Sequence, residues 1–163
     1  MSAENVRSAY LTNANATPIA LSNPHLRGVM KEAIGVLTPA AAAEVGSTHR
    51  FCRVPSNARI SQVMVKCAAM TGGAVDIGVY KTESQGGAAV DVDLFASAQV
   101  LTSALDWVDK TYESTEYSIA ESEKPLWEVL GLTADPCIEY DIVATVTTQF
   151  NAGTIYGVKV RYA

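Results

Sequence analysis

Apolar and polar residues alternate along much of the chain after residue 28, at the two-residue period of a β-strand. The clearest case is 58–68, where Val63, Val65 and Cys67 share one parity while Gln62 and Lys66 fall on the other. One face of this segment is mostly apolar and the other is mixed. The pattern predicts a half-buried antiparallel strand.

Six further segments alternate in the same way or are rich in Thr, Val, Ile and Tyr, which suit a pleated surface. Residues that favour turns separate them, and Asn151-Ala152-Gly153 is predicted to form a hairpin loop between the last two strands. Residues 96–105 fit either strand or helix, and residues 112–119 fit a strand or an extended loop. The six expected strands are 29–37, 48–54, 75–80, 90–95, 138–148 and 154–162.

One short helix is expected near residue 126. Ser122 suits the N-cap and Pro125 the first turn, where backbone N–H groups have no helical partner. The segment Leu126–Leu130 places apolar residues at i, i+3 and i+4, and Gly131 suits the position after the C-cap. These signals predict a helix of about two turns that plugs one end of a sheet.

These elements predict an all-β fold, an antiparallel β-sandwich or jelly roll with one short helix and an extended N-terminal arm. We expect an arm at 1–27 and a single domain at 28–163. The arm combines turn-forming residues with isolated apolar ones, so it either wraps its own domain or stays disordered, or it orders on a neighbouring subunit. The expected interface residues are Tyr10, Leu11, Ile19, Leu21, Leu26 and Trp107.

The charge balance, 17 acidic against 12 basic residues, gives a net charge of -5. The basic residues are scattered singly, which argues against nucleic-acid partners and against an anionic membrane surface. Residues 1–10 have no apolar core of a signal peptide, and three widely spaced cysteines, Cys52, Cys67 and Cys137, form no CxxC pair. We therefore expect free thiols, each buried in a strand as a small apolar group, and synthesis in a reducing cytoplasm.

Few residues suggest chemistry. His25 and His49 lack a matched nucleophile and acid, so they are expected to be polar surface or interface residues. Asp91 and Asp93 share a strand face and, with Asp76, either line a solvated face, bind Ca²⁺ or act as a carboxylate pair. We favour the solvated face, with calcium at Asp91 and Asp93 left open. We expect no catalytic, cofactor-binding or metal-binding residue, and no enzymatic activity.

Two tryptophans have different expected roles. Trp127 lies within the predicted helix and is assigned to the core, whereas Trp107 is the expected exposed aromatic and a candidate interface anchor. Trp107 with Tyr112 and Tyr117 would alternatively form a platform for stacking sugars.

Five segments resemble a family of small tailed-phage virion proteins, the head decoration or cement proteins. They are Val54–Ile60, Val75–Tyr80, Asp93–Ala98, Lys124–Glu128 and Tyr140–Val143. The resemblance covers about residues 50–163. It implies a β-sandwich or jelly-roll body, oligomers that are often trimers, and no cofactor.

The resemblance predicts a structural virion protein that binds the outside of a phage capsid and bridges neighbouring capsid subunits. Its expected partners are the major capsid protein and copies of itself, after synthesis in the cytoplasm of a bacterial host. The alternative is a carbohydrate-binding or receptor-binding β-sandwich module of a phage tail fibre.

Overall fold

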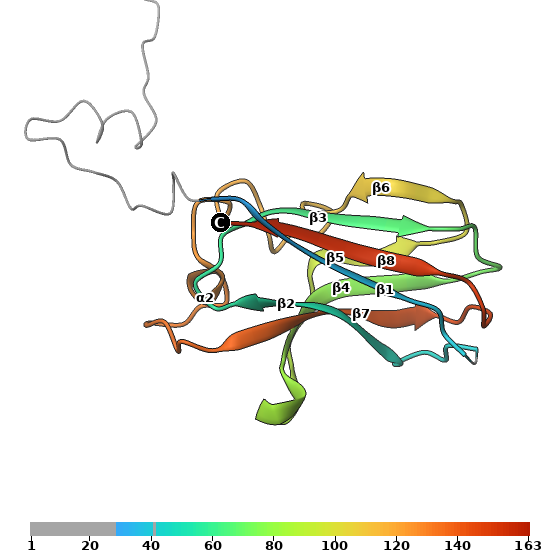
Figure 1. Ribbon diagram of the computed structural model, residues 1–163, viewed down its shortest axis with the longest axis horizontal. Coiled ribbons are helices and arrows are strands. Elements are labelled where there is room, and N and C mark those ends of the chain that lie inside the picture. The colour runs from blue at the N-terminus through green and yellow to red at the C-terminus, as the bar shows by residue number, and fades with distance from the viewer. Residues whose placement is uncertain (1–28, 41) are drawn as a thin grey trace, which may run out of the picture.

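A computed structural model describes residues 29–40 and 42–163. In this part of the chain, eight strands form two four-stranded antiparallel sheets that pack against each other (Figure 1). The strand order is β1-β8-β3-β6 in the first sheet and β2-β7-β4-β5 in the second. The prediction of an all-β antiparallel sandwich is confirmed, whereas the predicted arm and its residues Tyr10, Leu11, Ile19, Leu21 and Leu26 lie outside the described residues.

The strands fall close to the segments that the alternation predicted. Their bounds are β1 Lys31–Leu37, β2 Thr48–Pro55, β3 Ile60–Cys67, β4 Ala74–Lys81, β5 Ala89–Val100, β6 Leu105–Asp109, β7 Glu139–Thr148 and β8 Tyr156–Tyr162. The ambiguous segment 96–105 is divided between β5 and β6, and residues 112–119 form no strand.

The strand pairing is nested. β1 pairs with β8, β2 with β7, β3 with β6 and β4 with β5, and all four pairs are antiparallel. Further pairing of β3 with β8 and of β4 with β7 completes the two sheets. Strands that follow each other along the chain therefore mostly belong to opposite sheets.

The predicted hairpin between the last two strands is wrong, because β7 and β8 belong to different sheets. The loop between them carries Phe150, which is 1% exposed and lies in the core. Its backbone N–H and C=O bond to the C=O and N–H of Ala43 at 3.4 and 3.0 Å. Burying the Phe150 ring between the sheets directs the chain across the sandwich instead of back along the same sheet.

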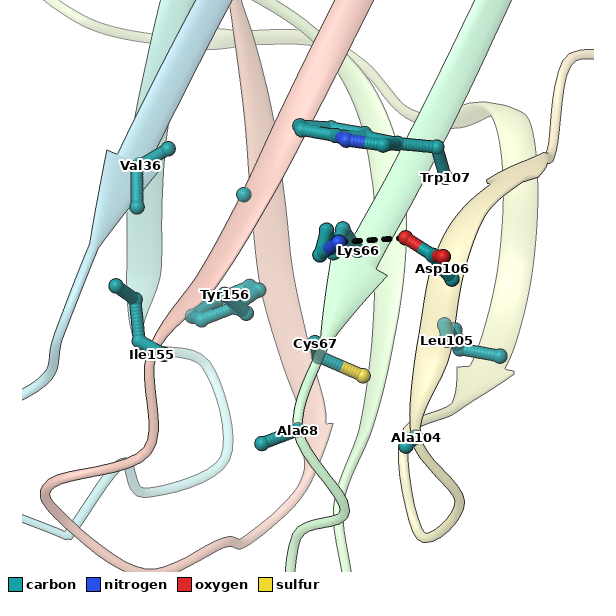
Figure 2. Close-up of a pocket in the computed structure, with 11 residues that line it drawn as sticks. Val36, Lys66, Cys67, Ala68, Ala104, Leu105, Asp106, Trp107, Ile155 and Tyr156 are labelled. Carbon is teal, nitrogen blue, oxygen red and sulfur yellow. Dashed lines mark hydrogen bonds and ion pairs between the residues drawn. The ribbon is translucent and has the colours of Figure 1, made fainter.

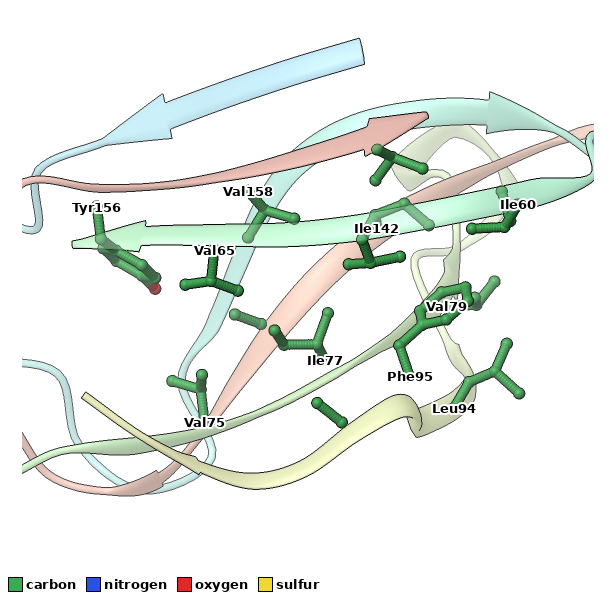
Figure 3. Close-up of a cluster of buried hydrophobic side chains, with 14 of the residues drawn as sticks. Ile60, Val65, Val75, Ile77, Val79, Leu94, Phe95, Ile142, Tyr156 and Val158 are labelled. Carbon is green, nitrogen blue, oxygen red and sulfur yellow. The ribbon is translucent and has the colours of Figure 1, made fainter. Parts of the chain in front are cut away.

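The core lies between the two sheets (Figure 3). Val65 and Val158 from the first sheet meet Ile77 and Ile142 from the second, and all four are at most 1% exposed. Burying a branched side chain of this size contributes about 1.5–3 kcal/mol. Ile60 also joins the core, although it has the opposite parity to Val65, because the register of β3 against β8 shifts between Ile60 and Gln62.

The helix α2 covers Leu126–Val129, one turn shorter than predicted. Its N-cap is Pro125, and the predicted N-cap Ser122 instead donates a hydrogen bond from its hydroxyl to the carbonyl of Ile119. No side-chain cap is needed there, because the loop between β2 and β3 accepts the first helical N–H groups: Leu126 N–H bonds to Ala58 O at 2.8 Å.

The predicted end of the helix is confirmed. Gly131 has a φ of 74°, and its N–H bonds to the carbonyl of Glu128, while the N–H of Leu132 bonds to the carbonyl of Trp127 at 3.1 Å. These two bonds form a Schellman motif, which favours glycine at this position. Leu126 is 1% exposed and closes one end of the core. Among the described residues, no helix has the length and apolar character to span a membrane.

Candidate interaction surface

Trp107 owes its position to a bulge in β6. Cys67 pairs with Leu105 and Val65 with Val108, so β6 has one more residue than β3 between these pairs. Trp107 has a φ of 51°, a left-handed conformation that is uncommon for a bulky residue. The bulge turns the indole over the outer face of the first sheet (Figure 2).

The indole of Trp107 covers a lysine of β8. The Nζ atom of Lys159 lies 4.6 Å from the centroid of the ring, within the range of a cation–π contact. The same Nζ atom lies 3.8 Å from Glu32 of β1, and the Lys159 side chain is only 12% exposed. These two contacts thus connect β6 and β1, the edge strands of the first sheet, through Lys159 of β8.

Beside Trp107 the outer face of the first sheet has a groove of about 530 Å³. Figure 2 shows Trp107 on one side of it and Val36 and Ile155 on the other. Gly157 lies between them, and the absence of a side chain there leaves backbone exposed to the ring: an added Cβ would meet Cη2 of Trp107 at 3.6 Å. We call this site the Trp107 groove; its lining residues are Val36, Lys66, Cys67, Ala68, Ala104, Leu105, Asp106, Trp107, Ile155, Tyr156 and Gly157.

The Trp107 groove is predominantly apolar. Val36 and Ile155 are 57% and 55% exposed, unusually high for branched apolar residues beside a cavity. The two charged lining residues pair with each other, since Nζ of Lys66 lies 2.5 Å from Oδ1 of Asp106. The groove therefore presents a concave apolar surface, and its two charged lining residues neutralise each other.

The sequence singled out Trp107 but none of its partners in the groove. The structure places Trp107 half-buried, between the exposed position expected of it and the core. Val36 and Ile155 come from opposite ends of the chain, and only the order β1-β8-β3-β6 brings them to one face. The available signal for the groove was Val36, an apolar residue at an outward position of β1, where alternation would place a polar one.

A cluster of three acidic residues lies outside the Trp107 groove, on β5 and the loop after β6. Carboxylate oxygens of Asp91, Asp93 and Glu116 all lie within 4.8 Å of one another, whereas Asp76 accepts a hydrogen bond from the backbone N–H of Ala98. The hydrogen bond with Asp91 and the charge of that neighbour raise the pKa of Glu116. Three carboxylates are oxygen ligands suited to Ca²⁺, which takes six to eight. The sequence missed Glu116, because it lies in the loop after β6.

β5, the strand that carries Asp91 and Asp93, is not oriented as its alternation indicates. Val90 and Val92 are 39% and 38% exposed, while Asp91 and Asp93 are half-buried. The register of β5 against β4 shifts between the pairs Ile77–Ala96 and Val79–Asp91. This irregularity separates the first half of β5 from the buried second half, so the prediction of a simple solvated face of aspartates is wrong.

His49 joins the two sheets. A hydrogen bond connects its Nδ1 atom to the hydroxyl of Tyr156, and its ring packs edge-on against Tyr156 and Phe150. Burial lowers the pKa of His49 and raises that of Tyr156. His49 is thus half-buried between aromatic rings; the other histidine, His25, lies outside the described residues.

The three cysteines differ in their surroundings. Cys67 is buried and Cys52 is half-buried, and burial raises the pKa of the Cys52 thiol to about 12. Cys137 is exposed in the loop before β7 with a φ of 53°. The prediction of a buried strand residue is wrong for Cys137, because an Asx-turn that begins at Asp135 keeps it outside the sheet: the N–H of Cys137 bonds to Oδ1 of Asp135.

The aromatic platform expected for sugars is not assembled. Tyr117 is 1% exposed and donates its hydroxyl hydrogen to the carbonyl of Ile60 at 2.7 Å. Its ring stacks on Tyr112 with the centroids 5.8 Å apart. Tyr117 therefore belongs to the core and has no free face for a ligand. Trp127, which was assigned to the core, is half-buried.

No protein-family model and no curated protein matches this chain. Among solved structures, a chain described as "Cyanophage Pam1 capsid asymmetric unit" is similar in fold, with a TM-score of 0.50. The match covers 91% of this chain and 95% of that chain at 14% sequence identity. At this identity the likeness concerns the fold.

Proposed function

We propose that this chain is a structural protein of a phage virion that binds the outer surface of the capsid and bridges neighbouring capsid subunits. One observation carries the proposal: the fold corresponds over 91% of this chain and 95% of the other to a chain from a cyanophage capsid. The resemblance of five segments to head decoration proteins points to the same class.

The architecture suits this role. The nested pairing β1–β8, β2–β7, β3–β6 and β4–β5 supports the interpretation of the sandwich as a jelly roll, an eight-stranded architecture common in viral capsids. Sheet packing gives a rigid body that can hold several contacts at fixed spacing. On a symmetric shell, modest contacts gain strength from high effective concentration, so a bridge needs no single tight site.

The proposal includes a homo-oligomer, a trimer on the shell, with the major capsid protein as its partner and the capsid exterior as its location. Trp107 remains a proposed contact residue, because its groove presents apolar surface. We assign the protein no catalytic step. The tail-fibre alternative loses support from the burial of Tyr117, which removes one of three proposed stacking rings.

The test uses the full chain and expanded shells made of the capsid protein encoded beside it. Cryo-electron microscopy of the mixture is expected to show added density at symmetric positions on the outside of the shell, across joints between subunits. Shells of an unrelated phage serve as the control. Shells that remain bare contradict the proposal, and glycan binding that is lost on Trp107→Ala favours the receptor-binding alternative.

A further inference from the structure

We infer that two copies of the free protein pack the outer faces of their first sheets against each other. In this dimer, the Trp107 groove of each copy is filled by one wall of the same groove in the other copy. That wall consists of Val36 and Ile155, and we call it the Val36 ridge. The inference goes beyond the capsid proposal, because it concerns two copies that meet in solution without a shell.

The outer face combines a groove with an apolar ridge beside it. Val36 and Ile155 lie on the side of the groove opposite Trp107 and are 57% and 55% exposed (Figure 2). Gly157 leaves the space between the ridge and the indole open, since it has no side chain. A two-fold axis brings the same surface of both copies together, so every contact occurs twice. Under such an axis the ridge of each copy can enter the groove of the other, which buries apolar atoms of both.

The indole of Trp107 is fixed in place before any partner arrives. Nζ of Lys159 lies 4.6 Å from the centroid of its ring, and the backbone φ of 51° belongs to the bulge that orients the ring. A large aromatic ring that is already ordered loses little conformational freedom on binding, which favours it at the centre of an interface. Trp107 therefore suits contact with the Val36 ridge of a second copy.

The charges of this face neutralise each other. Three carboxylates and three cations occupy outward positions of its strands: Glu32, Asp106, Asp109, Lys66, Lys159 and Arg161. Glu32 lies 3.8 Å from Nζ of Lys159 and 2.8 Å from Nε of Arg161, and Lys66 pairs with Asp106. The face is therefore neutral, although the chain has a net charge of -5. Two copies of an acidic protein can meet here without the repulsion between like charges that opposes association.

The face is large enough for a reversible dimer. Three of its four strands have seven or eight residues. At about 3.3 Å per residue and about 4.8 Å between strands, its flat area is roughly 400–500 Å² per copy. Two copies thus cover roughly 800–1,000 Å² before the corrugation of the surface is counted, close to the lower limit of a specific interface. We expect a dissociation constant on the order of micromolar.

The edges of the first sheet are less suited to joining two copies. β6 carries the bulge at Trp107 and the charged residues Asp106 and Asp109, and both features oppose pairing with another strand. β1, the other edge strand, lies so close to β2 that a Cβ at Gly35 would meet the carbonyl oxygen of Phe51 at 2.0 Å. The outer face is therefore the better surface for contact with a second copy.

The mass of the full-length protein in solution tests the inference. Sedimentation velocity over a range of concentrations is expected to show a rise from one chain of 17.3 kDa toward two. Val36→Ser and Ile155→Ser are each expected to raise the dissociation constant at least about tenfold, because symmetry removes the contact twice. The matched control is Ile119→Ser, which alters an isoleucine that is 84% exposed in the loop after β6 and is expected to change nothing. Circular dichroism verifies the fold of each variant.

A charge exchange provides a second test. Lys66→Glu makes each face acidic and is expected to weaken the dimer, because two like charges then meet across the two-fold axis. Lys66→Glu combined with Asp106→Lys restores both the ion pair and the neutrality of the face, and it is expected to restore the dimer. Both side chains are exposed, 51% and 82%, so neither change is expected to disturb the core.

Trp107 reports directly on the contact. Trp127→Phe leaves it as the single emitter. Dilution is expected to move its emission to longer wavelength in step with the fall in mass, because water reaches the indole.

Four outcomes overturn the inference: a single-chain mass at every concentration, equal effects of Val36→Ser and Ile119→Ser, a dimer that tolerates Lys66→Glu, or association that leaves the emission of Trp107 unchanged. A single chain whose Trp107 is shielded from acrylamide would assign the groove to another part of the same chain. None of these measurements requires a capsid, and a two-fold contact differs from the three-fold contact of a trimer on the shell. The failure of this inference is therefore distinguishable from that of the proposed function.

Discussion

The carboxylate of Asp141 in β7 is buried between two arginines of β2. Its Oδ2 atom accepts a hydrogen bond from Nη1 of Arg50 at 3.0 Å, and its Oδ1 atom accepts one from Nε of Arg53 at 2.6 Å. The Asp141 side chain is 7% exposed. Arg50 also donates to the carbonyls of Lys81 and Gly87, so the network fixes the base of the β4–β5 hairpin. The sequence showed only scattered charges here, because the three residues meet through strand pairing.

The substitution Asp141→Asn is expected to lower the free energy of unfolding by about 2–4 kcal/mol, because it leaves partly buried guanidinium groups without their counter-charge. Urea unfolding followed by circular dichroism measures the change. The control is Asp106→Asn, whose partner Lys66 is exposed, and it is expected to cost less than about 1 kcal/mol. Equal losses for the two substitutions would contradict a special role for burial at Asp141.

His49 gives the fold a pH dependence near neutrality. Burial lowers its pKa in the folded protein below the ordinary value of 6.5. Between the two values the unfolded chain binds a proton that the folded chain does not, so stability falls as the pH falls below about 6.5. The groups that face the ring are the uncharged Tyr156 and Phe150.

Thermal melts between pH 7.5 and pH 5 measure this effect. The parent protein is expected to lose more stability across this window than His49→Gln does. The carboxyls of Glu32 and Glu121 have a lowered pKa in the folded protein, and they remove stability only as the pH falls below about 4.5. A parent protein and variant with parallel profiles above pH 5 would show that His49 does not titrate with unfolding.

At the scale of the elements, Gly35 lets β1 lie against β2 of the opposite sheet. A Cβ atom at this position would lie 2.0 Å from the carbonyl oxygen of Phe51. Phe51 itself falls where the register of β2 against β7 shifts, between Arg50 and Cys52. The bulge presents backbone to β1, and only a residue without a side chain fits there. A glycine inside a strand usually weakens it, whereas Gly35 allows the close approach of β1 to β2 of the opposite sheet.

Gly35→Ala is therefore expected to lower the free energy of unfolding by about 1–3 kcal/mol, since the strands must separate to admit a methyl group against rigid backbone. Ile34→Ala, one residue away on the exposed side of β1, is the control and is expected to change stability by about 0.5 kcal/mol or less. Chemical denaturation measures both. A neutral Gly35→Ala would mean that β1 and β2 do not approach as closely as described.

Alternation placed six of the eight strands to within two residues, because each side chain's parity is a local property; it ended β5 five residues early and did not identify β6. It did not identify partners, since pairing depends on residues far apart: β1 pairs with β8, whose sequence lies more than a hundred residues away. The same limit applies to the site. Trp107 was recognisable by its type, but Val36, Ile155 and Gly157 acquire their role only from the strand order.

At the scale of the molecule, the nested pairing joins the beginning and the end of the described chain. The outermost pair closes a loop that contains all the other strands, and such long-range contacts are costly in chain entropy. Proteins dominated by non-local pairing fold in milliseconds to seconds. We expect refolding in that range, measured by stopped-flow fluorescence after dilution from urea; a microsecond phase that accounts for the full signal would contradict the prediction.

The pairing of Lys31 with Tyr162 has a practical consequence. A linker of a few residues could join these neighbouring positions, and new chain ends could be opened at the exposed segment Glu83–Gln85. This circular permutation would change the order of the strands along the chain but leave each strand beside its present neighbours. The new N- and C-termini of such a circular permutant would lie in the connection between β4 and β5 of the second sheet. The permutation would thereby move the point where foreign peptides can be fused from the first sheet, which holds β1 and β8, to the second sheet.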